Sequence, residues 1–215
     1  MTLPPDITPE RYEKMQKVVA ARQHGVIVIE DVSDPHNAEA VVRTADAFGF
    51  QSVYLIFENQ PPFDPWNTGK LTSSSANKWL DFHLYSSTAA CLTHLKAQGY
   101  TIVATALADN AENIFTADLT TPRIALLLGN EHRGLSATAL QLADRVLTIP
   151  MHGMVQSLNL SVTAAICLYE INRQRRQLDP APYAFSADEQ AALLANFVTR
   201  RYPPPIDNPT ALFND

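Results

Sequence analysis

The feature of this sequence that most constrains its fold is the alternation of short apolar runs with helical segments. The apolar runs predict buried strands at residues 26–32, 52–58, 101–107, 123–129 and 145–150. The helical segments lie at about residues 8–23, 37–48, 86–98, 136–143, 157–176 and 187–199. Strands that alternate with helices run parallel, and strands that are apolar throughout are covered on both faces. The sequence therefore predicts an α/β fold, a mostly parallel sheet with helices on both faces.

Local signals refine this outline at several places. Ser186 and Glu189 have the spacing of a capping box, which predicts the start of the last helix. Residues 59–79 are rich in Pro, Asn and Ser and predict a long functional loop. The Pro-rich tail at residues 200–215 is expected to be extended or disordered.

Composition narrows the class of protein. A length of 215 residues allows one substantial α/β core with appendages. No apolar run reaches the length of a membrane span, and the N-terminus lacks the apolar stretch of a signal peptide. The two cysteines, Cys91 and Cys167, lie far apart, which excludes a disulfide framework or a zinc ribbon and suits a reducing cytoplasm. The histidines show no metal-ligand spacing, so no metal is expected.

The distribution of charge is more informative than its total. A net charge of −6 argues weakly against a nucleic-acid partner, because phosphate binding needs Lys and Arg. Basic residues nevertheless gather in two segments, with Arg11, Lys14, Lys17 and Arg22 in the first and Arg173, Arg175 and Arg176 in the second. These clusters are either solvated helix faces or local anion-binding patches, and charge alone does not decide between them.

The stretch GNEHRGLS, residues 129–136, follows a predicted strand and has the two-glycine spacing of a P-loop. Leu135 stands where the phosphate-binding lysine must be, and the chain has no GxGxxG, so nucleotide-binding interpretations have little support. The polar residues between the glycines instead fall at the carboxyl end of a parallel sheet, where open α/β sheets bind ligands. An ordinary strand-to-helix loop is the alternative interpretation.

Two further stretches place polar side chains at predicted strand ends. In DPHNAEAVVR, Asn37 could be a helix cap, whereas Arg43 lies on an otherwise apolar helix and must either reach solvent or meet an anion. In MHGMVQSLN, Ser157 could also be a plain helix cap. Asn159 is predicted within a helix, where asparagine is disfavoured unless its amide has a function.

Together these stretches resemble the three motifs of the SPOUT superfamily of RNA methyltransferases. The three motif segments are Asn37 with Arg43, GNEHRGLS and IPMHGMVQSLNLSVTAAICLYE, and the resemblance extends beyond the motifs to TSSSANKW and HLKAQGYTIVATAL. The string IPM-x-GMVQSLN-x-SV is very specific. The resemblance covers roughly residues 8–176 and is strongest to the TrmH-type tRNA ribose 2′-O-methyltransferases. Within that type it is strongest to the branch that methylates the D-loop guanosine at tRNA position 18.

The resemblance implies a particular organisation. It implies a deep trefoil knot at the C-terminal end of the sheet, S-adenosylmethionine held there as the methyl donor, and a cytoplasmic homodimer that acts on tRNA. The methyltransferase domain would be residues 25–176. An N-terminal helical extension at residues 1–24 would bind tRNA, and residues 177–215 would form a C-terminal helical extension with a Pro-rich tail. No metal and no membrane association are expected.

The same resemblance implies roles for individual residues. The catalytic polar positions are Asn37, Arg43, Glu131, Ser157 and Asn159. The cofactor-binding positions are Thr105, Gly129, Ile149 and Leu158. The RNA-binding positions are Arg11, Lys14, Arg22, Arg173 and Arg175. Arg43 is expected to bind a phosphate bidentately and to activate the ribose hydroxyl electrostatically, because a guanidinium is a poor base.

Two departures from the family pattern leave the substrate open. Relatives often carry Lys where this chain has Asp34, and Glu-Lys where it has Glu131 and His132, so two positive charges near the expected RNA path are missing. One alternative is another target ribose, at the tRNA wobble position or in ribosomal RNA. A second alternative is a non-catalytic RNA-binding homologue that keeps the knot. The N-terminal helix and the basic C-terminal extension favour whole tRNA.

Overall fold

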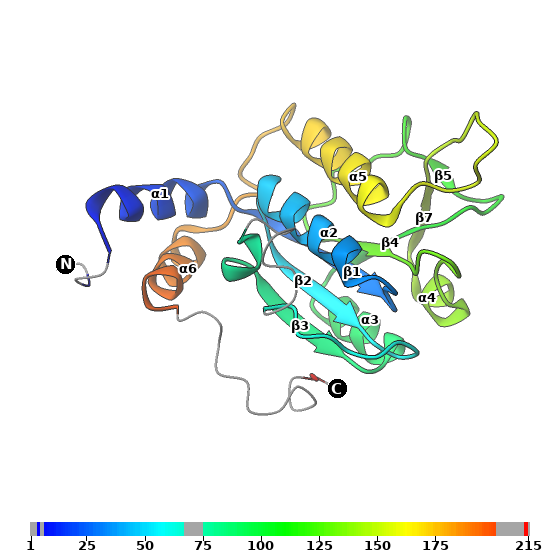
Figure 1. Ribbon diagram of the computed structural model, residues 1–215. Coiled ribbons are helices and arrows are strands. Elements are labelled where there is room, and N and C mark those ends of the chain that lie inside the picture. The colour runs from blue at the N-terminus through cyan, green and yellow to red at the C-terminus, as the bar shows by residue number, and fades with distance from the viewer. Residues whose placement is uncertain (1–3, 5–6, 67–74, 201–212, 215) are drawn as a thin grey trace.

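The computed structural model describes residues 4, 7–66, 75–200 and 213–214, and its centre is one seven-stranded sheet (Figure 1). The strands are β1 (Gln23–Glu30), β2 (Phe50–Ile56), β3 (Asp81–Tyr85), β4 (Thr101–Thr105), β5 (Glu112–Asn113), β6 (Ile124–Leu128) and β7 (Arg145–Thr148). Their order is β3-β2-β1-β6-β4-β7-β5, and each neighbouring pair is parallel. The predicted parallel sheet is confirmed, while β3 and β5 were not among the predicted strands.

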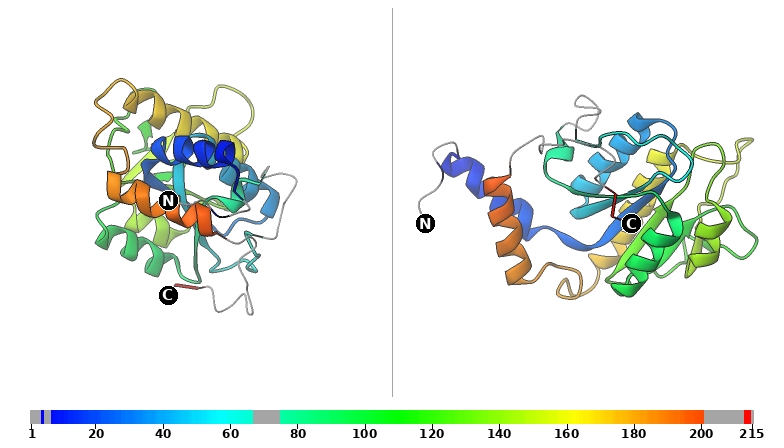
Figure 2. Two further views of the ribbon diagram at one scale, coloured as in Figure 1. Left: turned by 90° about the vertical axis from the view of Figure 1, so that its left-hand side faces the viewer. Right: turned by 90° about the horizontal axis from the view of Figure 1, so that it is seen from below.

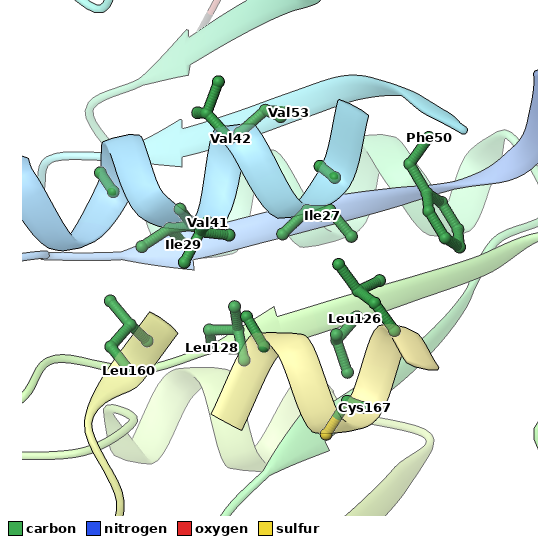
Figure 3. Packing of buried hydrophobic residues seen from close by; sticks show 14 of the residues in the cluster. Ile27, Ile29, Val41, Val42, Phe50, Val53, Leu126, Leu128, Leu160 and Cys167 are labelled. Carbon is green, nitrogen blue, oxygen red and sulfur yellow. The ribbon is translucent and has the colours of Figure 1, made fainter. Parts of the chain in front are cut away.

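Helices cover both faces of this sheet, as predicted. The helices of the described residues are α1 (Pro9–Ala20), α2 (Pro35–Ala47), η1 (Ala76–Lys78), α3 (Thr88–Ala97), α4 (Ala137–Leu142), α5 (Leu160–Arg175) and α6 (Ala187–Thr199). Helices α2 and α5 pack on one face, where Ile27 and Leu126 lie in the same apolar cluster as Val41 and Cys167 (Figure 3). Helices α3 and α4 pack on the other face against the alternate strand residues, such as Val28 and Leu127.

The strand residues alternate between the two faces because the side-chain period of a strand is two. Each face is therefore apolar, and burial of one Val, Leu or Ile side chain contributes about 1.5–3 kcal/mol. Cys91 and Cys167 form no disulfide among the described residues, and both are buried, one in each layer. Burial raises the pKa of the Cys167 thiol to about 12, so this side chain behaves as an apolar core group.

Helices α1 and α6 pack against each other at one end of the molecule (Figure 2). Met15 and Val19 of α1 lie in one buried cluster with Leu193 and Phe197 of α6. The predicted capping box is confirmed at α6, where Ser186 caps the backbone of the first turn and its partner carboxylate returns the contact. The N-terminal and C-terminal segments thus share a small core of their own.

Some predicted boundaries were wrong by a few residues. Helix α1 ends at Ala20 instead of residue 23, and β1 already begins at Gln23. Helix α5 begins at Leu160 instead of residue 157. Residues 67–74 of the predicted long loop and residues 201–212 of the tail lie outside the described residues. Near the chain end, Phe213 forms a parallel bridge with Leu84 at the edge strand β3.

Candidate active site

The carboxyl ends of three adjacent strands, β6, β4 and β7, open into a cavity of about 390 Å³. Thr105 ends β4, Gly129 follows β6, and Ile149 follows β7, and all three line the cavity. Leu158, from the segment before α5, lines it as well. The structure therefore brings together all four residues that the sequence suggested as cofactor-binding.

The wall of this cavity formed by residues 129–136 is a tight turn. Asn130 and Gly134 form an antiparallel bridge, and Gly134 has a φ of +68°. A Cβ atom on Gly129 would lie 2.5 Å from the backbone of Gly134 and Leu135, so only glycine fits there. The Asn130 side chain donates to the carbonyl oxygen of Asp31 at 2.6 Å. The glycines therefore serve a close backbone approach next to the cavity, and the segment is more than a generic connection.

A smaller cavity of about 360 Å³ lies beside the larger one. It is lined by Ser33, Asp34, Asn37, Glu131, His132, Ser157, Leu158 and Asn159. Glu131, His132, Ser157 and Leu158 line both cavities. Four of the five suggested catalytic residues thus gather at one place, where an apolar cavity meets a polar one.

A chain of hydrogen bonds fixes three of these side chains. Asn37 Nδ2 donates to Glu131 Oε1 at 2.9 Å, and Asn159 Nδ2 donates to Asn37 Oδ1 at 2.9 Å. The backbone N–H of Ser33 donates to Glu131 Oε2 at 2.9 Å, and that of Asp34 donates to Oε1 at 3.3 Å. This order leaves Glu131 as the acceptor at one end and sets the orientation of both amides.

The charge state of Glu131 follows from the same contacts. Partial burial acts to raise the pKa of its carboxyl, but the hydrogen bonds from Ser33, Asn37 and Asp34 outweigh burial, and the pKa is lowered. Glu131 is therefore an ionised acceptor near neutral pH. A carboxylate at this position can orient amides and hydroxyls but cannot donate a proton.

Asn159, and not Ser157, caps α5. Asn159 Oδ1 accepts from the backbone N–H of Ser161 at 2.8 Å, while its Nδ2 bonds Asn37. The interpretation of Ser157 as a plain helix cap is wrong, because the helix begins three residues later. Ser157 is exposed and lines both cavities. The expectation that Asn159 lies within the helix is also wrong, although its amide does have two partners.

Arg43 is the one suggested catalytic residue that lines neither cavity. It lies six residues after Asn37 on α2, which places it about 9 Å further along the axis and about 120° around it. Its side chain is exposed, and within the described ranges its guanidinium has no hydrogen-bond or ion-pair partner. The structure of one chain therefore leaves this cation free and separate from the Asn37 network.

Two of the suggested RNA-binding arginines are interior residues. Arg22 is 2% exposed and donates to Asp46 Oδ1 at 2.7 Å. Arg175 is 4% exposed and donates to the carbonyl oxygens of His24 and Thr121, both at 2.6 Å. Burial lowers the pKa of Arg175 to about 10. The expectation that these two side chains contact RNA is corrected, because their guanidinium groups are enclosed by the protein.

The other three suggested RNA-binding residues lie at the surface. Arg11 is exposed and sits 5.9 Å from the ring centroid of Trp79. Lys14 is exposed, with no partner among the described residues. Arg173 is exposed but pairs with Glu170, with two contacts of 2.7 Å. This ion pair already occupies the guanidinium of Arg173.

A basic cleft that the sequence did not resolve lies between α1 and the ends of α2 and α5. It has a volume of about 340 Å³, and its charged lining residues are Lys14, Lys17, Arg22, Asp46 and Arg176. Lys17 also pairs with Glu13 at 2.6 Å. The sequence identified Arg176 only as a member of the second basic segment. At the end of α5, the rotation between successive helical residues leaves Arg176 exposed while its neighbour Arg175 is buried.

Neither a metal-binding cluster nor a membrane-spanning helix is found among the described residues. No group of three or more His, Cys, Asp or Glu side chains in residues 7–66 and 75–200 is placed to hold a metal ion. No helix in the same part of the chain is long and apolar enough to cross a membrane.

Comparison with known proteins fits this arrangement. Residues 24–169 match the SpoU rRNA Methylase family. The match spans more than half of the chain and includes both cavities, and the chain belongs to this family.

Individual relatives are similar over most of their length. The chain is 39% identical over 171 residues to the tRNA (guanosine(18)-2′-O)-methyltransferase of Escherichia coli, covering 79% of this chain and 72% of that protein. The crystal structure of the A. aeolicus TrmH/SpoU tRNA modifying enzyme superimposes with a TM-score of 0.77 at 30% identity, covering 88% of this chain and 95% of the other. The SpoU methyltransferase AviRb from Streptomyces viridochromogenes, in complex with the cofactor AdoMet, gives a TM-score of 0.64 at 26% identity, covering 75% and 65%.

Proposed function

We propose that this protein transfers a methyl group from S-adenosylmethionine to a ribose 2′-oxygen of tRNA, at guanosine 18 of the D-loop. The observation that carries the proposal is the Glu131–Asn37–Asn159 hydrogen-bond chain at the junction of the two cavities. Because the chain belongs to a family of RNA methylases, the apolar cavity would hold the methyl donor and the polar network beside it would hold a ribose. The similarity to guanosine-18 methyltransferases over most of the chain supports this target.

The larger cavity fits S-adenosylmethionine in size and chemistry. Pockets for small cofactors have volumes of roughly 300–1,000 Å³ and mostly apolar walls with a few polar groups. Here the apolar walls would hold the adenine, and they come from Leu107, Leu135, Leu140, Ile149 and Leu158. Backbone groups at the tight approach of Gly129 to Gly134 would bind its polar edge. No metal is needed for this chemistry, since the donor carries an activated methyl group when bound.

The chain's own residues have to align the ribose and favour loss of the hydroxyl proton. S-adenosylmethionine, when bound, would supply the activated methyl group. The 2′-oxygen would receive this group while the sulfur keeps the electron pair of the broken bond, and the hydroxyl proton would pass to solvent. Alignment of two reactants can supply several kcal/mol, up to about 7–11 in the best cases. Ser157 and the Asn37–Asn159 pair would hold the ribose at the mouth of the cofactor cavity. Glu131 would keep the amides in the required orientation.

Arg43 would act electrostatically. A guanidinium remains protonated at neutral pH, so Arg43 is unsuited to remove the proton itself. Bidentate binding to the phosphate next to the target ribose would place a positive charge near the developing alkoxide and lower the pKa of the hydroxyl. The free, exposed guanidinium of Arg43 suits this role, provided that another surface brings the RNA to it.

A homodimer would provide that surface. Met154 is 100% exposed and Phe115 is 75% exposed, and Leu107 and Val155 are exposed as well, in the segments that follow β7, β5 and β4. Apolar side chains gathered on one surface mark interaction sites. A second copy of the chain would cover them, and Arg43 of one copy would then complete the site of the other. We also propose the deep trefoil knot at the carboxyl ends of β4, β6 and β7, and a cytoplasmic location, in which Cys91 and Cys167 stay reduced.

The basic cleft between α1 and the end of α5 would bind tRNA phosphates away from the reacting ribose. Lys14 and Arg176 are exposed and line it together with Lys17. These cations come from segments far apart in sequence, and they gather in one cleft although the chain has a net charge of −6. Arg11 would extend the patch along α1. Recognition of an RNA by phosphates and shape agrees with a surface outside the catalytic cavities.

The experiment that tests the proposed function is transfer of labelled methyl from S-adenosylmethionine to an unmodified tRNA transcript, with the modified nucleotide mapped. A 2′-O-methylguanosine at position 18 is the expected product. A methyl group at the wobble ribose would keep the reaction and change the target. Absence of transfer to tRNA would direct the same assay to ribosomal RNA, and cofactor binding without transfer to either RNA would support the non-catalytic alternative.

A further inference from the structure

Glu30 is a buried carboxylate that the proposed mechanism does not use. It ends β1, is 2% exposed, and lies between the starts of two helices. Its Oε1 atom accepts from Thr88 Oγ1 at 2.6 Å and from Ser136 Oγ at 2.7 Å. Its Oε2 atom accepts from the backbone N–H of Ser136 at 2.8 Å. Burial of a carboxylate costs free energy unless hydrogen bonds compensate for its lost hydration.

The groups that contact Glu30 favour a side chain that only accepts hydrogen bonds. Both hydroxyls and the backbone N–H point donors at it, and an ionised carboxylate is the side chain that only accepts. Thr88 is the first residue of α3, and Ser136 is the N-cap of α4. A negative charge is stabilised near helix N-termini by their unpaired N–H groups and by the helix dipole. An amide at this position would turn a donor toward at least one of these groups.

The Ser136 contacts connect Glu30 to the wall of the larger cavity. Ser136 closes the turn of residues 129–135, all of which line that cavity, and α4 continues from it with Leu140, a further lining residue. The other end of the turn is tied to the residue after Glu30, because Asn130 Nδ2 donates to the carbonyl oxygen of Asp31. The end of β1 therefore holds both ends of the turn.

We infer that Glu30 is a positioning residue for the methyl-donor cavity, acting through Ser136 on the turn of residues 129–135. This inference rests on the proposed function, because it takes the cavity to be the S-adenosylmethionine site. A loosened turn would widen the cavity and separate Gly129 from Gly134. Loss of a hydrogen bond to a charged group corresponds to roughly tenfold or more in an equilibrium constant. Glu30 would thus control cofactor affinity without touching the cofactor.

The two hydroxyls on Glu30 offer a matched pair of variants. Ser136→Ala removes the hydroxyl on the cavity side, whereas Thr88→Val removes the hydroxyl on the α3 side and leaves the turn tied. Glu30→Gln changes both contacts at nearly constant volume. The measurements are the Kd of S-adenosylmethionine by calorimetry and the Tm of each protein without cofactor, so that loss of folded protein is separated from loss of affinity.

The expected result is a Kd about tenfold weaker for Glu30→Gln and for Ser136→Ala, with Thr88→Val binding like the unchanged protein despite a lower Tm. The double variant Glu30→Gln with Ser136→Ala should bind S-adenosylmethionine no more weakly than Glu30→Gln alone, because Glu30 acts through Ser136. Equal Kd values for Ser136→Ala and Thr88→Val would overturn the inference. Failure of the unchanged protein to bind S-adenosylmethionine would instead overturn the proposed function, and with it the premise of the inference.

Discussion

The side-chain amide of Asn159 donates a hydrogen bond of 2.9 Å to Oδ1 of Asn37, joining two residues that are 122 positions apart in the chain. Asn37 in turn donates a hydrogen bond to Glu131, and Asn159 also caps α5. A single pair of amides therefore joins the start of α5 to the first turn of α2, in addition to the apolar packing between the two helices. The amide of Asn159 can be replaced by a carboxylate that still caps the helix.

Asn159→Asp should separate the catalytic role of this amide from its capping role. Aspartate caps a helix about as well as asparagine, so the Tm should change little. The new carboxylate has no donor for Asn37 Oδ1, and the network that ends at Glu131 loses one hydrogen bond. We expect kcat/KM for methyl transfer to fall about tenfold. An unchanged kcat/KM with an unchanged Tm would remove the network from the mechanism.

Arg43→Lys tests the phosphate clamp. Lysine keeps the positive charge but cannot present two parallel N–H donors to one phosphate. We expect kcat to fall by at least about tenfold while the Kd for S-adenosylmethionine stays constant, because Arg43 lines neither cavity. Single-turnover methyl transfer with saturating tRNA measures the chemical step directly. Near-normal turnover of this variant would argue against bidentate binding.

Arg175 and Arg176 are neighbours in sequence with opposite expected roles. Arg175→Met should destabilise the protein by about 2–4 kcal/mol, because it leaves the buried carbonyl oxygens of His24, Thr121 and Pro122 without a donor. Arg176→Met should change stability by less than about 0.5 kcal/mol, because Arg176 is exposed. Urea unfolding measures both values. Similar values for the two variants would contradict the burial of Arg175.

This pair also shows where prediction from sequence ends. The alternation of apolar runs and helices was enough to predict the parallel sheet and its two helical layers. The strand β3, DFHLY, was missed because four of its five residues are polar or aromatic and three of the five are only partly buried. The strand β5 was missed because it has two residues and pairs only with β7.

The candidate site divides in the same way. The resemblance to the SPOUT motifs suggested residues that line both cavities, because those motifs match this chain position by position. It could not separate Arg175 from Arg173, since both lie in the last turn of α5. The acceptors that bury Arg175 come from residues 23–24 and 121–122, which no local pattern connects to α5. Long-range partners of a charged side chain thus require the structure.

The basic cleft predicts how tRNA affinity responds to salt. Each cation that contacts a phosphate releases counterions, so log Kd should rise linearly with log salt concentration. Lys14→Ala and Arg176→Ala should each weaken binding and reduce this slope by about 1. Lys96→Ala, on α3 at the other face of the sheet, is the control and should leave the slope unchanged. Filter binding over a range of salt concentrations provides the measurement. Slopes that match the control would exclude Lys14 and Arg176 from the tRNA surface.

His83 predicts a loss of stability in mild acid. Burial lowers the pKa of His83 from its usual 6.5, although the nearby Asp81 opposes this effect. Between the lowered pKa of the folded state and about pH 6.5, the unfolded chain binds more protons than the folded one. The contribution of His83 to the free energy of unfolding is therefore complete above about pH 6.5 and is lost as the pH falls toward the pKa of the folded state.

His83→Phe keeps a ring to stack on Tyr54, whose ring centroid lies 4.4 Å from that of the imidazole, and removes the titration. The variant should lose less stability than the unchanged protein between about pH 7.5 and about pH 5.5, as measured by urea midpoints. His152→Asn, on an exposed loop, controls for removal of a histidine. Equal acid sensitivity of the unchanged protein and His83→Phe would show that other groups govern this range.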